Sequence, residues 1–135
     1  SADSINQSMP KYVAQRALAM IDSSIVNPRV LILGVAYKSG VGDVRETPVS
    51  ELRSYLISVG AQVAWHDPLV STWANSTSQD LDWDCDLAIL ATKQDGMEFD
   101  KLIVKRIQIL DCTNSIKHLN FPRFSTLKSK IIYAS

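Results

Sequence analysis

The chain lacks an excess of charge of either sign and lacks any long apolar run. Its 135 residues include 14 Lys or Arg and 14 Asp or Glu, so the formal net charge is +0. Without a basic surface, a nucleic-acid partner is not expected. No apolar stretch approaches the roughly 20 residues that span a bilayer. Residues 1–10 also lack a charged-then-apolar signal pattern, so we expect neither a membrane partner nor export.

Cysteine is scarce as well, since only Cys85 and Cys112 are present. Two cysteines cannot form a disulfide framework and fit a reducing compartment, so we expect a cytoplasmic protein. Neither has a histidine nearby in the sequence, and their spacing is not that of metal ligands. We therefore expect both to be inert thiols.

The hydrophobic share of 46% is sufficient for one buried core in a chain of this length. Short apolar runs alternate with helical patterns, which is typical of βαβ units and of a parallel sheet covered by helices. Strands are expected at residues 29–36, 61–65, 86–91, 106–111 and 130–133. Helices are expected at residues 12–21, from Thr47-Pro48 to just before Gly60, and at 99–105. The least patterned segment, 69–80, is expected to be a loop with a short helix.

The first predicted helix stands apart from the alternating pattern. Ser8 is a plausible start for it, and Asn27-Pro28 separates it from the first strand. We therefore predict a connecting helix and linker over residues 1–26 and an α/β domain over 27–135.

Ligands of open parallel sheets bind beyond the carboxyl ends of the strands. The loop after the first predicted strand contains Lys38 and Arg45 and leads into a helix. It matches neither GxGxxG nor a P-loop. Two cations and free helix amides would favour an anion such as a phosphate. Alternatively, both cations are solvated surface charges, with Arg45 paired to Asp43 or Glu51.

The run 66–68 (HDP) could supply an acid–base histidine or an acidic ligand for a ribose hydroxyl. An ordinary turn at a strand end is the favoured interpretation.

The alternating acidic residues of 80–86 have a superficial likeness to a calcium loop. Cys85 occupies the position that needs glycine, and Ala91 occupies that of the bidentate glutamate. No metal site is expected there.

Several motifs together resemble one family. Residues 34–38 (GVAYK) and 42–48 (GDVRETP) resemble the pattern G-x-A-[FY]-K … D-x-R-[EN]-[ST]-P of the C-terminal domain of the UDP-glucose/GDP-mannose dehydrogenase family. Residues 60–68 (GAQVAWHDP), 85–92 (CDLAILAT) and 109–114 (ILDCTN) resemble three further family segments in the same order. The resemblance covers nearly the whole chain.

The resemblance implies a Rossmann-like domain that holds the nucleoside diphosphate of a UDP-sugar, either UDP-glucose or a UDP-N-acetylhexosamine. Family members bind NAD mainly in an N-terminal domain and oxidise the sugar alcohol to a carboxylate in two hydride transfers. Their catalytic cysteine lies upstream of the region present here, so no catalytic residue is expected in this fragment, which should be inactive alone. The remainder of the same chain and a second copy, forming a homodimer, are the implied partners.

The resemblance also implies roles for individual residues. Tyr37 and Lys38 match positions that contact the nucleotide-sugar substrate, and Arg45 matches a position that reaches the NAD. One departure is at residues 112–114 (CTN), where family members often have an arginine. A non-catalytic nucleotide-binding or dimerisation module of the same fold is the alternative.

Overall fold

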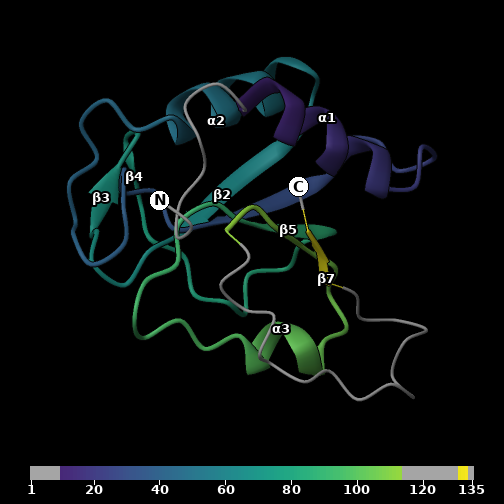
Figure 1. The fold of residues 1–135 in the computed structure, drawn as a ribbon. Coiled ribbons are helices and arrows are strands. Elements are labelled where there is room, and N and C mark those ends of the chain that lie inside the picture. Colours follow the sequence, from purple (N-terminus) through teal and green to yellow (C-terminus); the bar gives the residue numbers. More distant parts are fainter. Residues whose placement is uncertain (1–9, 114–130, 134–135) are drawn as a thin grey trace.

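A five-stranded parallel sheet forms the centre of the computed structural model, which describes residues 10–113 and 131–133 (Figure 1). The strand order is β2-β1-β5-β6-β7, and every neighbouring pair is parallel. The strands are β1 (Arg29–Leu33), β2 (Gln62–His66), β5 (Leu87–Leu90), β6 (Ile109–Asp111) and β7 (Ile131–Tyr133). The predicted α/β fold with an open parallel sheet is confirmed.

The central strands are β1 and β5, and their apolar runs are buried on both faces of the sheet. Val30 and Ile32 belong to a core cluster on one face, whereas Leu31 and Leu33 belong to a cluster on the other. A continuous apolar run is what such double burial requires. Strand β1 ends three residues earlier than predicted, because Gly34 adopts a φ of 82° and turns the chain away.

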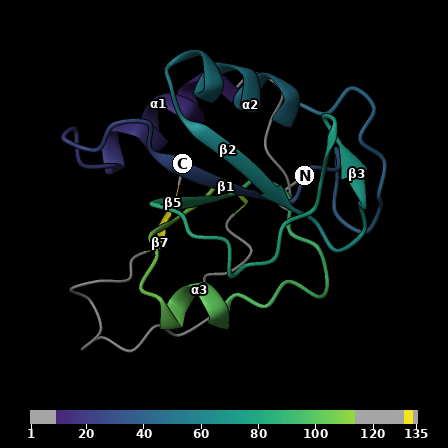
Figure 2. The ribbon, with the colours of Figure 1, turned by 180° about the vertical axis from the view of Figure 1, so that it is seen from behind.

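Helices cover both faces of the sheet (Figures 1 and 2). Helices α1 (Pro10–Met20) and α2 (Val49–Ser58) lie on one face, and α3 (Asp100–Val104) lies on the other. The three predicted helices are present, although the expected start at Ser8 lies outside the described residues. Within the described part of the chain, no helix is long and apolar enough to cross a membrane.

Helix α1 packs into the core rather than standing free of it. Val13, Ala14 and Ala17 are fully buried and share one cluster with Leu52 and Leu56 of α2. Small alanine side chains let the two helices approach closely, which is why this face of α1 can be buried. The assignment of residues 1–26 to a connector therefore stays a prediction, and in this structure the described part of α1 belongs to the same core.

The segment after β2 differs from the prediction. The expected short helix within residues 69–80 is wrong, because this segment forms a hairpin of β3 (Thr72–Trp73) and β4 (Ser76–Thr77). Ala74 and Asn75 both have positive φ, as a two-residue hairpin turn requires. Trp73 packs edge-on against Trp65 at 5.8 Å between ring centroids, and this tertiary contact holds the hairpin on the sheet.

The order in which strands are added to the sheet reverses after β2. The chain goes from β1 to β2 on one side and then returns to β5 on the other side of β1. The loops that follow β1 and β5 therefore start at adjacent strand ends, which is where such sheets bind ligands. A close backbone approach joins their bases, since a Cβ on Gly34 would lie 1.8 Å from the carbonyl oxygen of Thr92.

We expect Gly34→Ala to lower the free energy of unfolding by about 3 kcal/mol or more, because it combines a left-handed backbone with a backbone clash. Gly40→Ala is the matched control. Gly40 has a similar φ of 83°, but nothing lies within 4 Å of its added Cβ. It should cost only about 1 kcal/mol. Urea unfolding of the two variants measures the difference, and equal losses would contradict the close approach.

Candidate functional site

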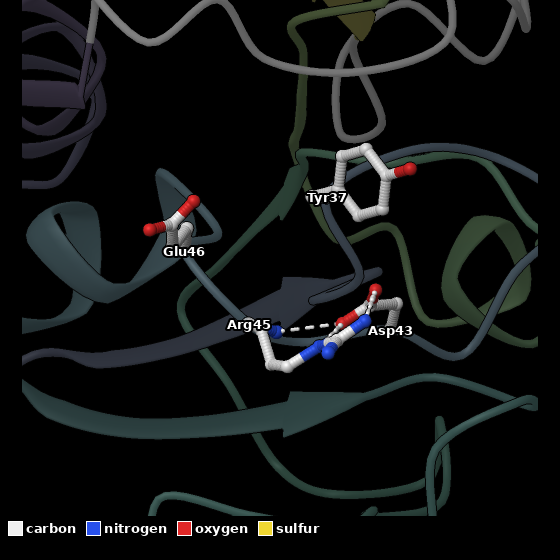
Figure 3. Close-up of a pocket in the computed structure, with 4 residues that line it drawn as sticks. All are labelled: Tyr37, Asp43, Arg45 and Glu46. Atoms are coloured by element: carbon white, nitrogen blue, oxygen red, sulfur yellow. Dashed lines mark hydrogen bonds and ion pairs between the residues drawn. The ribbon is translucent and has the colours of Figure 1, made fainter.

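A hollow of about 510 Å³ lies at the loop after β1 and is lined by Tyr37, Asp43, Arg45 and Glu46 (Figure 3). The Tyr37 amide donates a hydrogen bond of 3.0 Å to the Asp43 carbonyl, which folds the loop back on itself. This contact brings Tyr37 and Arg45, eight positions apart in the sequence, to the same hollow. Tyr37 is 41% exposed, so its side chain is accessible to a ligand.

The guanidinium of Arg45 forms a two-point ion pair with the carboxylate of Asp43. Nε donates to Oδ1 at 3.0 Å and Nη2 donates to Oδ2 at 2.8 Å, while the Arg45 amide also donates to Oδ1 at 3.0 Å. Of the alternatives left open by the sequence, pairing with Asp43 is the one observed. The Arg45 side chain is nevertheless 86% exposed, and the pair presents its outer edge to solvent.

Lys38 lies beside this hollow without lining it. Its ammonium group is 5.5 Å from the centroid of the Tyr37 ring. Within residues 10–113 it takes part in no ion pair, unlike Arg45. The structure thus places Tyr37 and Arg45 in the lining of one hollow and Lys38 next to Tyr37, where it forms no ion pair with any described residue.

The start of α2 offers fewer free donors than the sequence suggested. The Val49 amide donates to the Thr47 hydroxyl at 3.3 Å, and the Ser50 amide donates to the Thr47 carbonyl at 3.1 Å. A second hollow of about 460 Å³ at this helix end is bordered by the carboxylates of Glu46 and Glu51. Anion binding at this edge of the sheet therefore depends on the loop cations more than on helix amides.

Sequence reasoning missed the structural importance of Asp67. The turn interpretation was incomplete, because this carboxylate is only 1% exposed and holds two loops. Its Oδ2 accepts the amides of Val35 at 2.9 Å and Ala36 at 3.3 Å, and its Oδ1 accepts the amide of Leu69 at 2.9 Å. An acidic residue just after the second predicted strand was the signal that could have indicated this role.

Its neighbour His66 faces protein atoms. The Nδ1 atom lies 2.7 Å from the carbonyl oxygen of Gln79 and so carries the hydrogen. The Nε2 atom is buried and has no hydrogen-bond partner among the described residues. This surrounding does not favour the acid–base role considered for the histidine.

The two cysteines are poorly suited to act as nucleophiles. Burial raises the pKa of the Cys85 thiol to about 11. Burial, with the neighbouring Asp111 carboxylate, raises the pKa of the Cys112 thiol to about 12. Thiolates are the reactive form, so both side chains are inert near neutral pH. Among residues 10–113 and 131–133, no group of three or more His, Cys, Asp or Glu could hold a metal ion.

The Asp43–Arg45 pair predicts an abnormal titration. The hydrogen bond from the Arg45 side chain, followed by that from the Arg45 amide, lowers the pKa of Asp43 from 3.8 to about 2. Because the folded pKa is depressed, the stabilisation by this carboxylate is present above about pH 4 and is lost as the pH falls toward 2. NMR titration of the Asp43 carboxyl should show this, and Arg45→Met should restore the ordinary pKa. Arg53→Met, in α2, is the control that should leave it low.

The thiols give a second expectation. At pH 8, iodoacetamide should alkylate Cys85 and Cys112 on the order of a hundredfold more slowly in the folded chain than in urea. Mass spectrometry of quenched samples measures both rates separately. Rapid modification of either thiol in the folded chain would show that it is accessible and ionised.

Comparison with known proteins places this geometry in a family. The model of the UDP-glucose/GDP-mannose dehydrogenase family, UDP binding domain, matches residues 31–118. UDP-N-acetyl-D-mannosamine dehydrogenase of Methanococcus aeolicus is 29% identical over 87% of this chain and 29% of its own length. The enzyme of the same name from Methanocaldococcus jannaschii is 32% identical over 79% of this chain and 25% of its own length. The chain thus spans less than a third of these relatives.

Solved structures show the same fold. UDP-N-acetyl-mannosamine dehydrogenase Cap5O from S. aureus superposes with a TM-score of 0.72 at 22% identity, over 95% of this chain and 31% of that one. The sheet and its covering helices are accordingly those of the Rossmann-like domain of these proteins. Because the family model matches well over half of the sequence and includes the loop that forms the hollow, the chain belongs to the UDP-glucose/GDP-mannose dehydrogenase family and contains its UDP binding domain.

Proposed function

We propose that this chain is the substrate-nucleotide-binding part of an NAD-dependent nucleotide-sugar 6-dehydrogenase. The full protein would oxidise a UDP-sugar, either UDP-glucose or a UDP-N-acetylhexosamine, to the uronic acid. The observation that carries the proposal is the hollow shared by Tyr37 and Arg45, with Lys38 beside it, at the point where the strand order reverses. It lies inside the segment that matches the UDP binding domain.

The charges around the hollow indicate that Lys38, and not Arg45, binds the pyrophosphate. Arg45 is balanced by Asp43, and Glu46 adds a further carboxylate to the lining. Without Lys38, these groups sum to a negative charge, which would repel a pyrophosphate. Lys38 supplies the uncompensated positive charge and can swing from Tyr37 toward the phosphate oxygens as a flexible point charge. The exposed ring of Tyr37 provides a flat apolar contact beside it.

Arg45 suits a second anion rather than the first. Its Nε and Nη2 atoms are held by Asp43, so the guanidinium is kept in one orientation with its remaining donors toward solvent. In the full protein we assign these donors to NAD, which the preceding domain would present across the crevice. When bound, NAD supplies the hydride acceptor, while the residues of this chain bind and orient the nucleotide sugar.

The rest of the machinery belongs to the part of the protein that this chain does not include. The two UDP-N-acetyl-D-mannosamine dehydrogenases described above are about three to four times as long as the matched segment. We assign the main NAD site and the catalytic cysteine to that part, and we propose that the isolated fragment does not turn over. A cytoplasmic homodimer is the assembly that we propose for the full protein.

The proposal is tested by titrating UDP into the full-length protein by calorimetry. Lys38→Met should weaken UDP binding by about 1–3 kcal/mol, because it leaves the pyrophosphate without its main cation. Lys105→Met is the matched control, since Lys105 follows α3 at the opposite edge of the sheet and should leave the affinity unchanged.

Turnover is tested separately. The wild-type full-length protein should produce NADH with UDP-glucose or a UDP-N-acetylhexosamine, and the isolated chain should not. Binding of UDP without NADH formation from any of these sugars would favour the non-catalytic nucleotide-binding module. Equal affinity of the Lys38→Met variant and the wild type would remove Lys38 from the site.

A further inference from the structure

Gln94 joins the two loops at the carboxyl edge of the sheet. It follows β5, and its side chain is only 1% exposed. Its Oε1 accepts the Gly40 amide at 2.7 Å, and its Nε2 donates to the Val41 carbonyl at 2.7 Å and to Oδ2 of Asp67 at 3.4 Å. Only one orientation of the amide satisfies a donor, a carbonyl and a carboxylate in these positions. Gln94 is therefore a buried and specific clamp on the loop that follows β1.

Gln94 anchors the loop on one side of its exposed residues, Tyr37 and Lys38. After these two residues, Gln94 holds Gly40 and Val41, and the Ser39 hydroxyl donates to the Lys93 carbonyl at 2.5 Å. Before Tyr37, the Asp67 carboxylate accepts a hydrogen bond from the Ala36 amide. The Thr92 hydroxyl donates to the Ala36 carbonyl at 2.8 Å.

Tyr37 and Lys38 are thus the exposed residues between two anchored points of the loop. The loop would be mobile without these anchors, because Gly40 has a positive φ and no atom lies within 4 Å of the position that a Cβ would take there. Glycine in such a place has wide conformational freedom, so fixing it restricts the directions that Lys38 can take.

We infer that Gln94 is a positioning residue for nucleotide binding, which acts by clamping Gly40 and Val41 so that Lys38 stays beside the hollow. The inference rests on the proposed function, since it assigns Gln94 a role in the affinity of that same site. Gln94 itself touches no ligand. Its contribution passes through the position of Lys38.

The experiment is a double-mutant cycle in the full-length protein, with UDP as the probe and calorimetry as the readout. Gln94→Met keeps the side-chain length but removes both hydrogen-bonding functions. We expect it to raise the Kd for UDP about tenfold in the wild-type background. In the Lys38→Met background, the same change should raise the Kd less than twofold, because the cation that Gln94 positions is already absent.

Two further variants separate positioning from general destabilisation. Gln62→Met makes the same substitution at the first residue of β2, where the Gln62 side chain accepts a hydrogen bond of 2.9 Å from Arg29. It should leave the Kd unchanged. Gln94→Asn retains a buried amide but is too short to hold both Gly40 and Val41, so it should reproduce the loss of affinity if Gln94→Met does not fold. Urea unfolding verifies the folded fraction of each variant.

The outcomes are distinct. If the wild type binds UDP and the Gln94 variants bind it equally well, the inference is wrong and the proposed function stands. An equal loss in both backgrounds also overturns it, because Gln94 would then act on the fold and not through Lys38. If the wild type does not bind UDP, the proposed function fails first and the inference fails with it.

Discussion

The buried carboxylate of Asp67 is the constraint on which the carboxyl edge of the sheet depends. Removing a carboxylate from water costs several kcal/mol unless hydrogen bonds replace its hydration. Here two amides from the loop after β1, one amide from its own loop and the amide group of Gln94 serve that purpose. Meeting this requirement draws three segments together, since no single one of them has enough donors. The loop that carries Tyr37 and Lys38 starts from that junction.

The two cations of the loop at this edge of the sheet differ in how their charge is balanced. Asp43 and Arg45 neutralise each other in an exposed pair, and such pairs contribute little to stability. Their geometry matters more for orientation, because the two-point contact keeps the guanidinium in one plane. Lys38 has no such partner among the described residues and keeps its charge available. Within the described residues, one loop therefore carries a cation paired with a carboxylate and a cation outside any ion pair.

The architecture was predictable because it depends on local patterns. The doubly buried runs of β1 and β5 and the amphipathic runs of α1 and α2 are all visible as periodicity. The β3–β4 hairpin was not predictable in this way. Its strands are only two residues long, and it is held by the contacts of Trp73 and Ser76 with Trp65, which lies outside the hairpin. No local pattern encodes such a contact.

The candidate site likewise has some features that were predictable from the sequence and others that were not. The sequence by itself determined that Tyr37, Lys38 and Arg45 lie in the loop after the first strand, because a motif records residue types and their spacing. Only the tertiary structure decided that Arg45 pairs with Asp43, that the start of α2 has most of its donors occupied, and that Asp67 and Gln94 anchor the loop. The Asp67 and Gln94 contacts join residues 32 and 54 positions apart, so they form only because the fold brings those strand ends together.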